Sequence, residues 1–261
     1  MGIKRRRNTS FGIVLRNQLL LEKIKEIKAE HPFWGYRRIW AYLRYKLGFK
    51  VNAKRIYRLL KTNELLVKPN LKLIAKRKVI GSKPKPTKPN EWWGIDMTKV
   101  MIDGFGWVYV VLVLDWYTKK IVGHYAGIQS KAKHWLEALD KALNKQFPDG
   151  VRHQENLNLM SDNGCQPTAV SFMRECGILG IKQAFTSYNN PKGNADTERM
   201  MRTLKEELVW INEWKNPQDF FGKLDSWIEY YNNEYLHSSL KYQTPANFEK
   251  QMLGDTPLAA A

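Results

Sequence analysis

The 261-residue chain has little cysteine and no long apolar run. Its two cysteines, Cys165 and Cys176, are too few for a disulfide framework and indicate a reducing compartment. A zinc site is not expected, because two cysteines and a few scattered histidines do not provide a suitable set of ligands. The longest unbroken apolar run, Trp107 to Leu114, is far below the roughly 18 residues of a membrane span. The basic N-terminus also lacks the apolar core of an export signal. We therefore expect a cytoplasmic protein with no membrane partner.

Acidic residues are scarce in the first third of the chain. Residues 1–90 contain 25 Lys and Arg but only four Glu and no Asp, a net charge of +21, whereas residues 91–261 carry −3. So one-sided an excess would repel itself without a polyanionic partner, and nucleic acid is the commonest one. A solvated basic surface is the alternative. The charge pattern favours a nucleic-acid-binding N-terminal region.

A segment rich in proline and lysine, residues 81–90, is the clearest domain boundary and predicts a semi-extended linker. Before it, residues 1–80 predict an all-α domain. The first helix is expected over Val14 to Glu30, with apolar residues near a 3.6-residue period at Leu15, Leu19, Ile24 and Ile27. A helix ending near Gly48 and another capped by Asn52 follow it. This is a helix-turn-helix arrangement on a three-helix core.

The last of these helices has a basic face. A positively charged helix after a tight turn is how helix-turn-helix proteins reach the major groove of DNA. Arginine can read guanine there, while lysine mostly contacts phosphate. A plain basic helix bundle is the alternative. The side chains expected to bind DNA are Lys54, Arg55, Arg58 and Lys61.

After the linker the hydrophobic period changes. Three consecutive strands are expected first, with the first two joined by a hairpin turn at residues 103–106. Helices and strands then alternate up to a long helix over Ala195 to Trp210. The fold class is therefore α/β, with a mixed sheet flanked by helices. We expect the core over residues 91–212, completed by a helical tail over residues 213–261.

Three acids are placed together by this layout. Asp96 lies in the first strand, Asp162 ends the fourth, and Glu198 opens the long helix, with 35 residues between the last two. Asp162 could cap a turn, or it could meet a cation there with the other two acids. Three carboxylates suit Mg²⁺ or Mn²⁺ rather than zinc. Converging negative charges also require cations, because repulsion would otherwise raise their pKa values.

The flanking sequences resemble the D,D(35)E transposases and retroviral-type integrases, and nearly the whole chain takes part. It is most similar to the second-frame product of the insertion-sequence transposases that are read from two overlapping frames. Six stretches carry the resemblance, in order: HPFWGYRRIWAYLR with VNAKRIYRLLKTNELL, NEWWGIDMTKV, VLDWYTKKIVGHYAG, SDNGCQPT, GNADTERMMRTLKEEL and YYNNEYLHSSLKYQTPANF. The chain departs from the family pattern at Gly193, where Asp is usual, and at Tyr235, where Arg is common.

The resemblance implies a ribonuclease H-like core in which Asp96, Asp162 and Glu198 are the catalytic acids and hold two Mg²⁺ or Mn²⁺ ions. Asp96 would bridge both ions. Arg202 and Lys205 share a helix face with Glu198 and are expected to contact DNA phosphates. The alternative is a solvated row of charges with ordinary ion pairs to Glu206 or Asp196. Asp115 is expected to be structural.

The expected function is DNA transposition, with cleavage at the element's ends and transfer of the 3′-hydroxyl to another strand. The expected partners are double-stranded DNA (terminal repeats and target), at least a second copy of the chain, and in some cases a fused upstream-frame product. The expected location is the bacterial cytoplasm, at the nucleoid. Two alternatives stay open: an inactive or domesticated DNA-binding regulator, and a metal-dependent nuclease that does not join strands.

Overall fold

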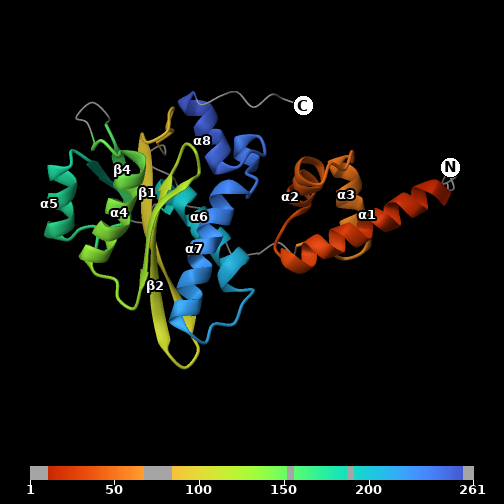
Figure 1. The fold of residues 1–261 in the computed structure, drawn as a ribbon, viewed down its shortest axis with the longest axis horizontal. Coiled ribbons are helices and arrows are strands. Elements are labelled where there is room, and N and C mark those ends of the chain that lie inside the picture. Colours follow the sequence, from red (N-terminus) through yellow and green to blue (C-terminus); the bar gives the residue numbers. More distant parts are fainter. Residues whose placement is uncertain (1–10, 68–83, 152–155, 187–190, 255–261) are drawn as a thin grey trace, which may run out of the picture. The chain divides into compact units, whose positions relative to one another are not determined.

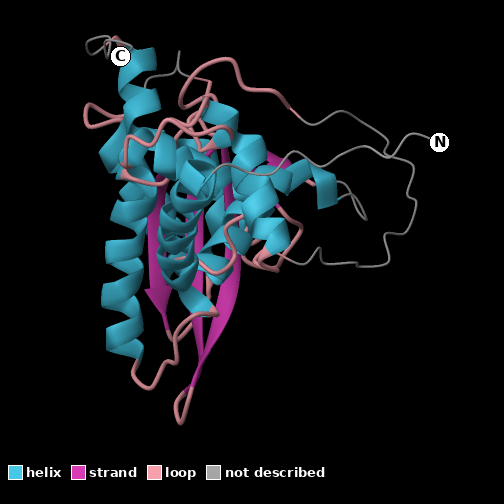
Figure 2. Ribbon diagram, turned by 90° about the vertical axis from the view of Figure 1, so that its right-hand side faces the viewer, coloured by secondary structure: helices cyan, strands magenta, loops and turns pink. Residues whose placement is uncertain are grey.

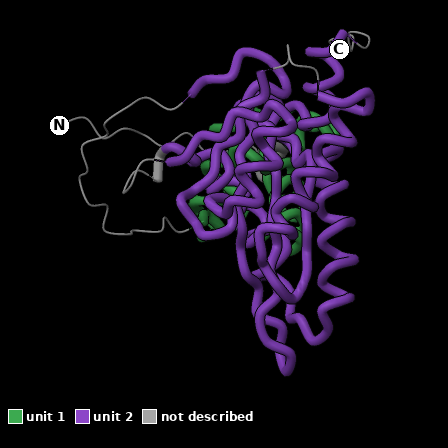
Figure 3. Tube along the Cα trace, turned by 90° about the vertical axis from the view of Figure 1, so that its left-hand side faces the viewer, with its two compact units in different colours: residues 1–74 green, residues 75–261 purple. Residues whose placement is uncertain are grey.

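The computed structural model of the chain describes residues 11–67, 84–151, 156–186 and 191–254 (Figure 1). The chain divides into two compact units, residues 1–74 and 75–261 (Figure 3). Residues 68–83, which contain both this division and the expected start of the linker, lie outside the described residues. No described helix has the length and apolar character that a bilayer span requires.

The first unit is helical. Its elements are α1 (Phe11–Glu30), α2 (Tyr36–Ala41), which continues as a π-helical turn (Tyr42–Lys46), and α3 (Ala53–Thr62). The Asn52 side chain caps α3 by accepting the N–H of Lys54 at 2.8 Å. Gly48 adopts a φ of +70° just after the π-helical turn, a conformation that glycine reaches without a steric cost. Both predicted helix signals are confirmed.

The apolar core of the first unit involves only part of α1. The residues buried in this core are Leu20, Ile24, Ile27, Trp34, Ile39, Leu43, Val51, Ile56 and Leu60. Leu15 and Leu19, which were expected on the same stripe, are 49% and 58% exposed. The reason is length: a 20-residue helix spans about 30 Å, and the short helices α2 and α3 cover only its second half (Figure 1).

The second unit contains a five-stranded mixed sheet, with strands in the order β3-β2-β1-β4-β5 (Figure 2). The strands are β1 (Trp92–Ile102), β2 (Gly106–Asp115), β3 (Ile121–Gly127), β4 (Asn158–Ser161) and β5 (Lys182–Phe185). The first three pair antiparallel, and β1-β4-β5 pair parallel. The predicted hairpin and the predicted mixed α/β sheet are confirmed.

Helices cover both faces of this sheet. They are α4 (Ala132–Gln146), α5 (Val170–Ile178), α6 (Ala195–Leu204) with a π-helical turn (Lys205–Val209), α7 (Pro217–Asn233) and α8 (Pro245–Leu253). Because successive side chains of a strand point to opposite faces, the sheet contributes residues to two apolar cores, one on each face. Trp93 and Ile95 of β1 pack with α4 and α5, whereas Val100 and Ile102 pack with α6 and α7.

The C-terminal tail is part of the second core. Phe220, Leu224 and Trp227 of α7 are buried together with Val100 and Leu112 of the sheet. Burying a large apolar side chain contributes roughly 1.5–3 kcal/mol each. The helix α7 is thus buried against the sheet and contributes to its core.

Asp115 ends β2 and is fully buried. One carboxylate oxygen accepts the N–H of Tyr117 at 2.7 Å and that of Thr118 at 3.3 Å, and the other accepts the N–H of Asn90 at 2.8 Å. Burial raises the pKa of Asp115 to about 6, while these donated bonds act in the opposite direction. The carboxylate joins the entry to β1 with the turn after β2, which is the structural role expected from the sequence.

Asp115→Ala is expected to lower the free energy of unfolding by roughly 3 kcal/mol, because it leaves three backbone N–H groups without their acceptor. Urea denaturation followed by tryptophan fluorescence measures this. Asp140→Asn, at an exposed position of α4, is the control and should change stability by less than about 0.5 kcal/mol. Equal stability of the two variants would contradict the structural role.

Candidate functional site

Two of the predicted acids stand at the same level of the sheet. Gly94 of β1 is paired with Met160 of β4 in parallel register. Two residues further along each strand come Asp96 and Asp162, the latter being the first residue after β4. Alternation places both on the face of Met160, which is buried in the core beneath α6 and α7. Asp96 and Asp162 therefore each follow the Gly94–Met160 pair by two residues.

The third acid, Glu198, lies in the first turn of α6, and a glycine lets this turn approach the sheet. A Cβ added at Gly94 would lie only 1.9 Å from Thr197 Oγ1 and 2.4 Å from Trp116 Nε1. The Trp116 indole N–H donates to Thr197 Oγ1 at 3.0 Å. Glycine in a strand interior marks such a close approach. The first turn of α6 thus contacts β1 two residues before Asp96.

The charges of the other two acids act on Asp96. The pKa of Asp96 is raised to about 6, first by burial and then by the negative charges of Asp162 and Glu198. The N–H of Met97, which donates to Asp96 Oδ1 at 2.7 Å, and the charge of Lys205 act in the opposite direction. Burial also raises the pKa of Glu198. A divalent cation among these carboxylates would relieve their repulsion.

The side chains of these acids do not converge tightly on one point. Among the described residues, no group of three or more His, Cys, Asp or Glu is close enough to hold a metal ion. Asp162 is exposed, and its Oδ1 accepts the N–H of Gly164 at 3.0 Å, as the turn-cap alternative requires. This bond uses one carboxylate oxygen, so it is compatible with metal binding through the other. The donor set consists of hard carboxylate oxygens, which fits Mg²⁺ or Mn²⁺.

The raised pKa of Asp96 predicts a pH-dependent stability in metal-free protein. An acid whose folded pKa exceeds its unfolded value contributes stability below about pH 4, which is lost as the pH rises through about 6. Asp96→Asn stays neutral, so in EDTA it should be about 1–2 kcal/mol more stable than wild type at pH 7.5 and equal at pH 4. Urea denaturation at both pH values measures this. A stability difference that does not change with pH would contradict it.

The basic residues of α3 fall into two groups. Lys54, Arg58 and Lys61 are exposed. Arg55 is half-buried, and its guanidinium donates two hydrogen bonds to Asn17 Oδ1, at 2.9 and 2.7 Å. Arg55 thus joins α3 to α1, whereas the other three remain the candidate DNA contacts of this helix.

The two basic residues predicted on α6 also differ in their contacts. Arg202 Nε donates to Glu206 Oε1 at 2.7 Å, which is the ion pair considered as the alternative to a phosphate contact. Lys205 lines a pocket beside β1, and its positive charge lowers the pKa of Asp96. Of the two, Lys205 is the one that lies near the candidate acids.

The structure shows the surroundings of Tyr235 and Gly193, the two residues that depart from the family pattern. Tyr235 is 1% exposed and belongs to the core beneath α7, so it is a packing residue. A Cβ at Gly193 would lie 3.0 Å from Thr186 Cγ2. A larger residue at this position would therefore require Thr186 to shift.

The contact that positions α6 was not predicted from the sequence. Its residues Gly94, Thr197 and Trp116 come from three separate segments, and none of them is charged. The only sequence signal for it is a glycine inside an otherwise apolar strand. Trp107 starts the longest apolar run of the chain, yet its side chain is 44% exposed.

Both units match known domain families. The HTH-like domain family matches residues 15–72. The Integrase core domain family matches in two parts, residues 86–191 and 179–245, which together span more than half of the chain. A chain in the structure of the simian T-cell lymphotropic virus intasome with PP2A regulatory subunit B56 gamma has the same fold, with a TM-score of 0.54 at 15% identity over 85% of this chain and 76% of that one. The second unit is an integrase core of the ribonuclease H-like fold, as predicted.

Curated relatives narrow this class. The transposase for insertion sequence element IS904 of Lactococcus lactis subsp. lactis (strain IL1403) is 28% identical over 90% of this chain and 95% of its own length. The putative transposase InsK for insertion sequence element IS150 of Escherichia coli (strain K12) is 28% identical over 88% and 82%. The transposase InsD for insertion element IS2A/D/F/H/I/K of Escherichia coli is 24% identical over 89% and 78%. The chain belongs to the insertion-sequence transposases with an integrase core.

Proposed function

We propose that this transposase cleaves a phosphodiester bond at the ends of its mobile element and joins the freed 3′-hydroxyl to another DNA strand, with Asp96, Asp162 and Glu198 as the catalytic acids. The observation that supports the proposal is the strand register, in which Asp96 and Asp162 each follow the paired residues Gly94 and Met160 by two positions, and Met160 packs in the core that includes α6. The influence of Glu198 on the pKa of Asp96 supports the third position.

The three acids would hold two Mg²⁺ or Mn²⁺ ions, which supply activation of the attacking oxygen and stabilisation of the leaving oxygen in phosphoryl transfer. Asp96 is fixed by the central strand β1 and is the acid influenced by both others. Asp162 is oriented by its turn with Gly164. Lys205 supplies positive charge beside the acids, where a DNA phosphate would bind.

The first unit would bind duplex DNA at the terminal repeats of the element through the exposed face of α3. Pairing two element ends for one reaction requires two such chains, so the active assembly is at least a dimer, with or without a fused upstream-frame product. Target DNA would then reach the same acids.

Cleavage of a plasmid carrying the element ends, with Mg²⁺ or with EDTA, tests this function. We expect nicks at the ends and strand-transfer products with Mg²⁺ only. Cleavage without transfer products would identify a nuclease, and DNA binding without any cleavage would identify a regulator. Either outcome contradicts the proposed reaction.

Loss of basic side chains from α3 should reduce the salt dependence of DNA binding. Each phosphate contact contributes about −0.9 to the slope of log K against log[salt]. Lys54→Ala/Arg58→Ala should therefore make the slope shallower by about 1.8 in anisotropy titrations with duplex DNA. Arg16→Ala/Lys25→Ala, at exposed positions of α1, is the charge-matched control and should retain the wild-type slope. An equal change in both variants would count against a specific role of α3.

A further inference from the structure

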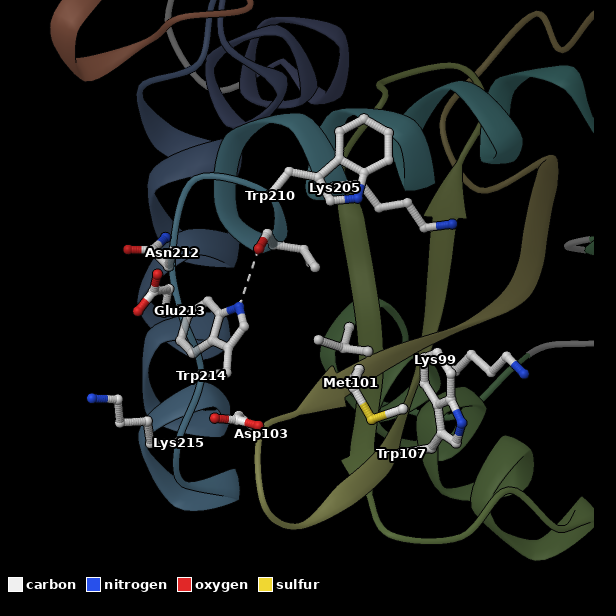
Figure 4. A pocket seen from close by; sticks show the side chains of 12 residues that line it. Lys99, Met101, Asp103, Trp107, Lys205, Trp210, Asn212, Glu213, Trp214 and Lys215 are labelled. Atoms are coloured by element: carbon white, nitrogen blue, oxygen red, sulfur yellow. Dashed lines mark hydrogen bonds between the residues drawn. The ribbon is translucent and has the colours of Figure 1, made fainter.

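A pocket of about 670 Å³ lies in the second unit (Figure 4). One wall is the β1–β2 hairpin, which contributes Lys99, Met101 and Trp107, and the other is the π-helical turn after α6 with the residue that follows it, which contribute Lys205 and Trp210. Lys205 connects the pocket with the candidate acids, because it follows Glu198 by about two turns along α6 and its π-helical turn. The pocket is thus close to the proposed reaction centre without being part of it.

The walls of the pocket expose large apolar side chains. Trp107 is 44% exposed, Met101 50% and Trp210 57%. Beneath them Trp214 is buried, with its indole N–H donating to the Val209 carbonyl at 3.2 Å (Figure 4). The pocket thus combines a buried floor with the exposed side chains of Trp107 and Trp210, which present apolar surface to solvent.

The backbone holds both walls in place. The N–H of Asp103, at the hairpin tip, donates to the carbonyl of Trp214 at 2.8 Å. In the π-helical turn the N–H of Trp210 donates to the carbonyl of Lys205 at 2.8 Å, so these two residues lie one turn apart. A π-helical turn is rare and occurs frequently at functional sites. Here it brings a cation and an indole to the same wall.

The side of the pocket near Trp107 carries only positive charge among the lining residues. Figure 4 shows Lys99 and Lys205 extending on the side of Trp107, while Asp103, Glu213 and Lys215 lie on the opposite side. Lys99 Nζ lies 4.5 Å from the centroid of the Trp107 ring, a cation–π contact. Positive charge therefore lies next to the exposed ring, as required for a ligand that combines a flat apolar surface with an anionic group.

We propose that this pocket binds an unpaired nucleotide of the DNA substrate, with the base stacked on Trp107 or Trp210 and its phosphate held by Lys99 and Lys205. The inference rests on the proposed function and specifies which part of the DNA this region binds. Stacking on aromatic side chains together with lysines along the backbone is the general mode of single-strand binding. Duplex bases are already stacked on one another, so the pocket takes a base that has left the duplex at a cut or frayed end.

Binding of two DNAs tests the proposal in the full chain. One is a short duplex with flush ends, and the other is the same duplex with a single-stranded thymidine tail. The double variant Trp107→Ala/Trp210→Ala should weaken binding of the tailed DNA about tenfold, a typical loss for one stacked base, while binding of the flush duplex stays within about twofold. Trp107→Tyr should retain most of the preference for the tail.

Controls separate stacking from folding. Phe105→Ala and Ile211→Ala remove exposed apolar side chains next to the pocket, which neither of them lines, and should retain the wild-type tail preference. Equal weakening with both DNAs, or no weakening, would overturn the proposal. So would a changed oligomeric state in sedimentation with an unchanged tail preference, which would assign the pocket to a second copy of the chain.

Measuring this binding in EDTA, in the Asp96→Asn background, keeps the inference distinguishable from the proposed function. A tail preference that depends on the two tryptophans supports the pocket even if plasmid cleavage fails. Cleavage with a tryptophan-independent tail preference would retain the function and reject the pocket.

Discussion

Asp96→Asn is expected to reduce both DNA cleavage and strand joining at least about a thousandfold, since a lost metal ligand removes several kcal/mol of transition-state stabilisation. Asp96 lies on the central strand and is the acid influenced by both Asp162 and Glu198. Asp162→Asn and Glu198→Gln should have effects of the same order. Product formation with Mg²⁺ on DNA carrying the element ends is the measurement.

DNA binding supplies the internal control for this result. It should stay within about twofold of wild type, because the predicted contacts of α3 belong to the other unit. Glu175→Gln, at an exposed position of α5, removes a carboxylate from the opposite side of the sheet and should retain full activity. Wild-type turnover by Asp96→Asn would refute the assignment of the catalytic acids.

The second large effect, on both stability and activity, is expected from Gly94→Ala, which adds a single methyl group. In Gly94→Ala the new Cβ would lie 1.9 Å from Thr197 Oγ1 and 2.4 Å from Trp116 Nε1. The first turn of α6 must then move away from β1 and take Glu198 with it. We expect a loss of about 1–3 kcal/mol in stability from overpacking and a loss of activity of at least about a hundredfold from the misplaced acid.

Gly222→Ala is the matched control, since a Cβ at this position of α7 has no neighbour within 4 Å. Alanine in a helix interior is about 0.5–1 kcal/mol more favourable than glycine, so this variant should be slightly more stable and fully active. Thermal unfolding and the cleavage assay compare the two. If Gly94→Ala keeps wild-type activity, the contact between α6 and β1 does not position Glu198.

The sequence predicts those features that depend on local chemistry. Asn52 caps a helix and Gly48 ends one because each does so through its own backbone and its nearest neighbours. The alternation in β1 and β2 likewise fixes which side chains face each core. The order of the strands likewise predicts that Asp96 and Asp162 lie on neighbouring strands, and β1 and β4 do pair, with Gly94 opposite Met160.

Features that depend on contacts between residues far apart in the sequence could not be predicted from it. Periodicity indicates an apolar stripe on α1 but not how far its partners extend, so the exposure of Leu15 and Leu19 was missed. Arg55 has the spacing of a DNA contact, yet Asn17, 38 residues away, takes its guanidinium. The pocket around Trp107 forms between the β1–β2 hairpin and the π-helical turn after α6, and no local sequence pattern predicts it.

The central claim is that Asp96, Asp162 and Glu198 gather around divalent ions. Anomalous diffraction from crystals of the transposase with Mn²⁺ and DNA of the element ends tests it most directly. We predict two anomalous peaks, each about 2.1–2.3 Å from carboxylate oxygens of these acids, with Asp96 contacting both. Manganese bound elsewhere, with the three carboxylates pointing apart, would contradict the account.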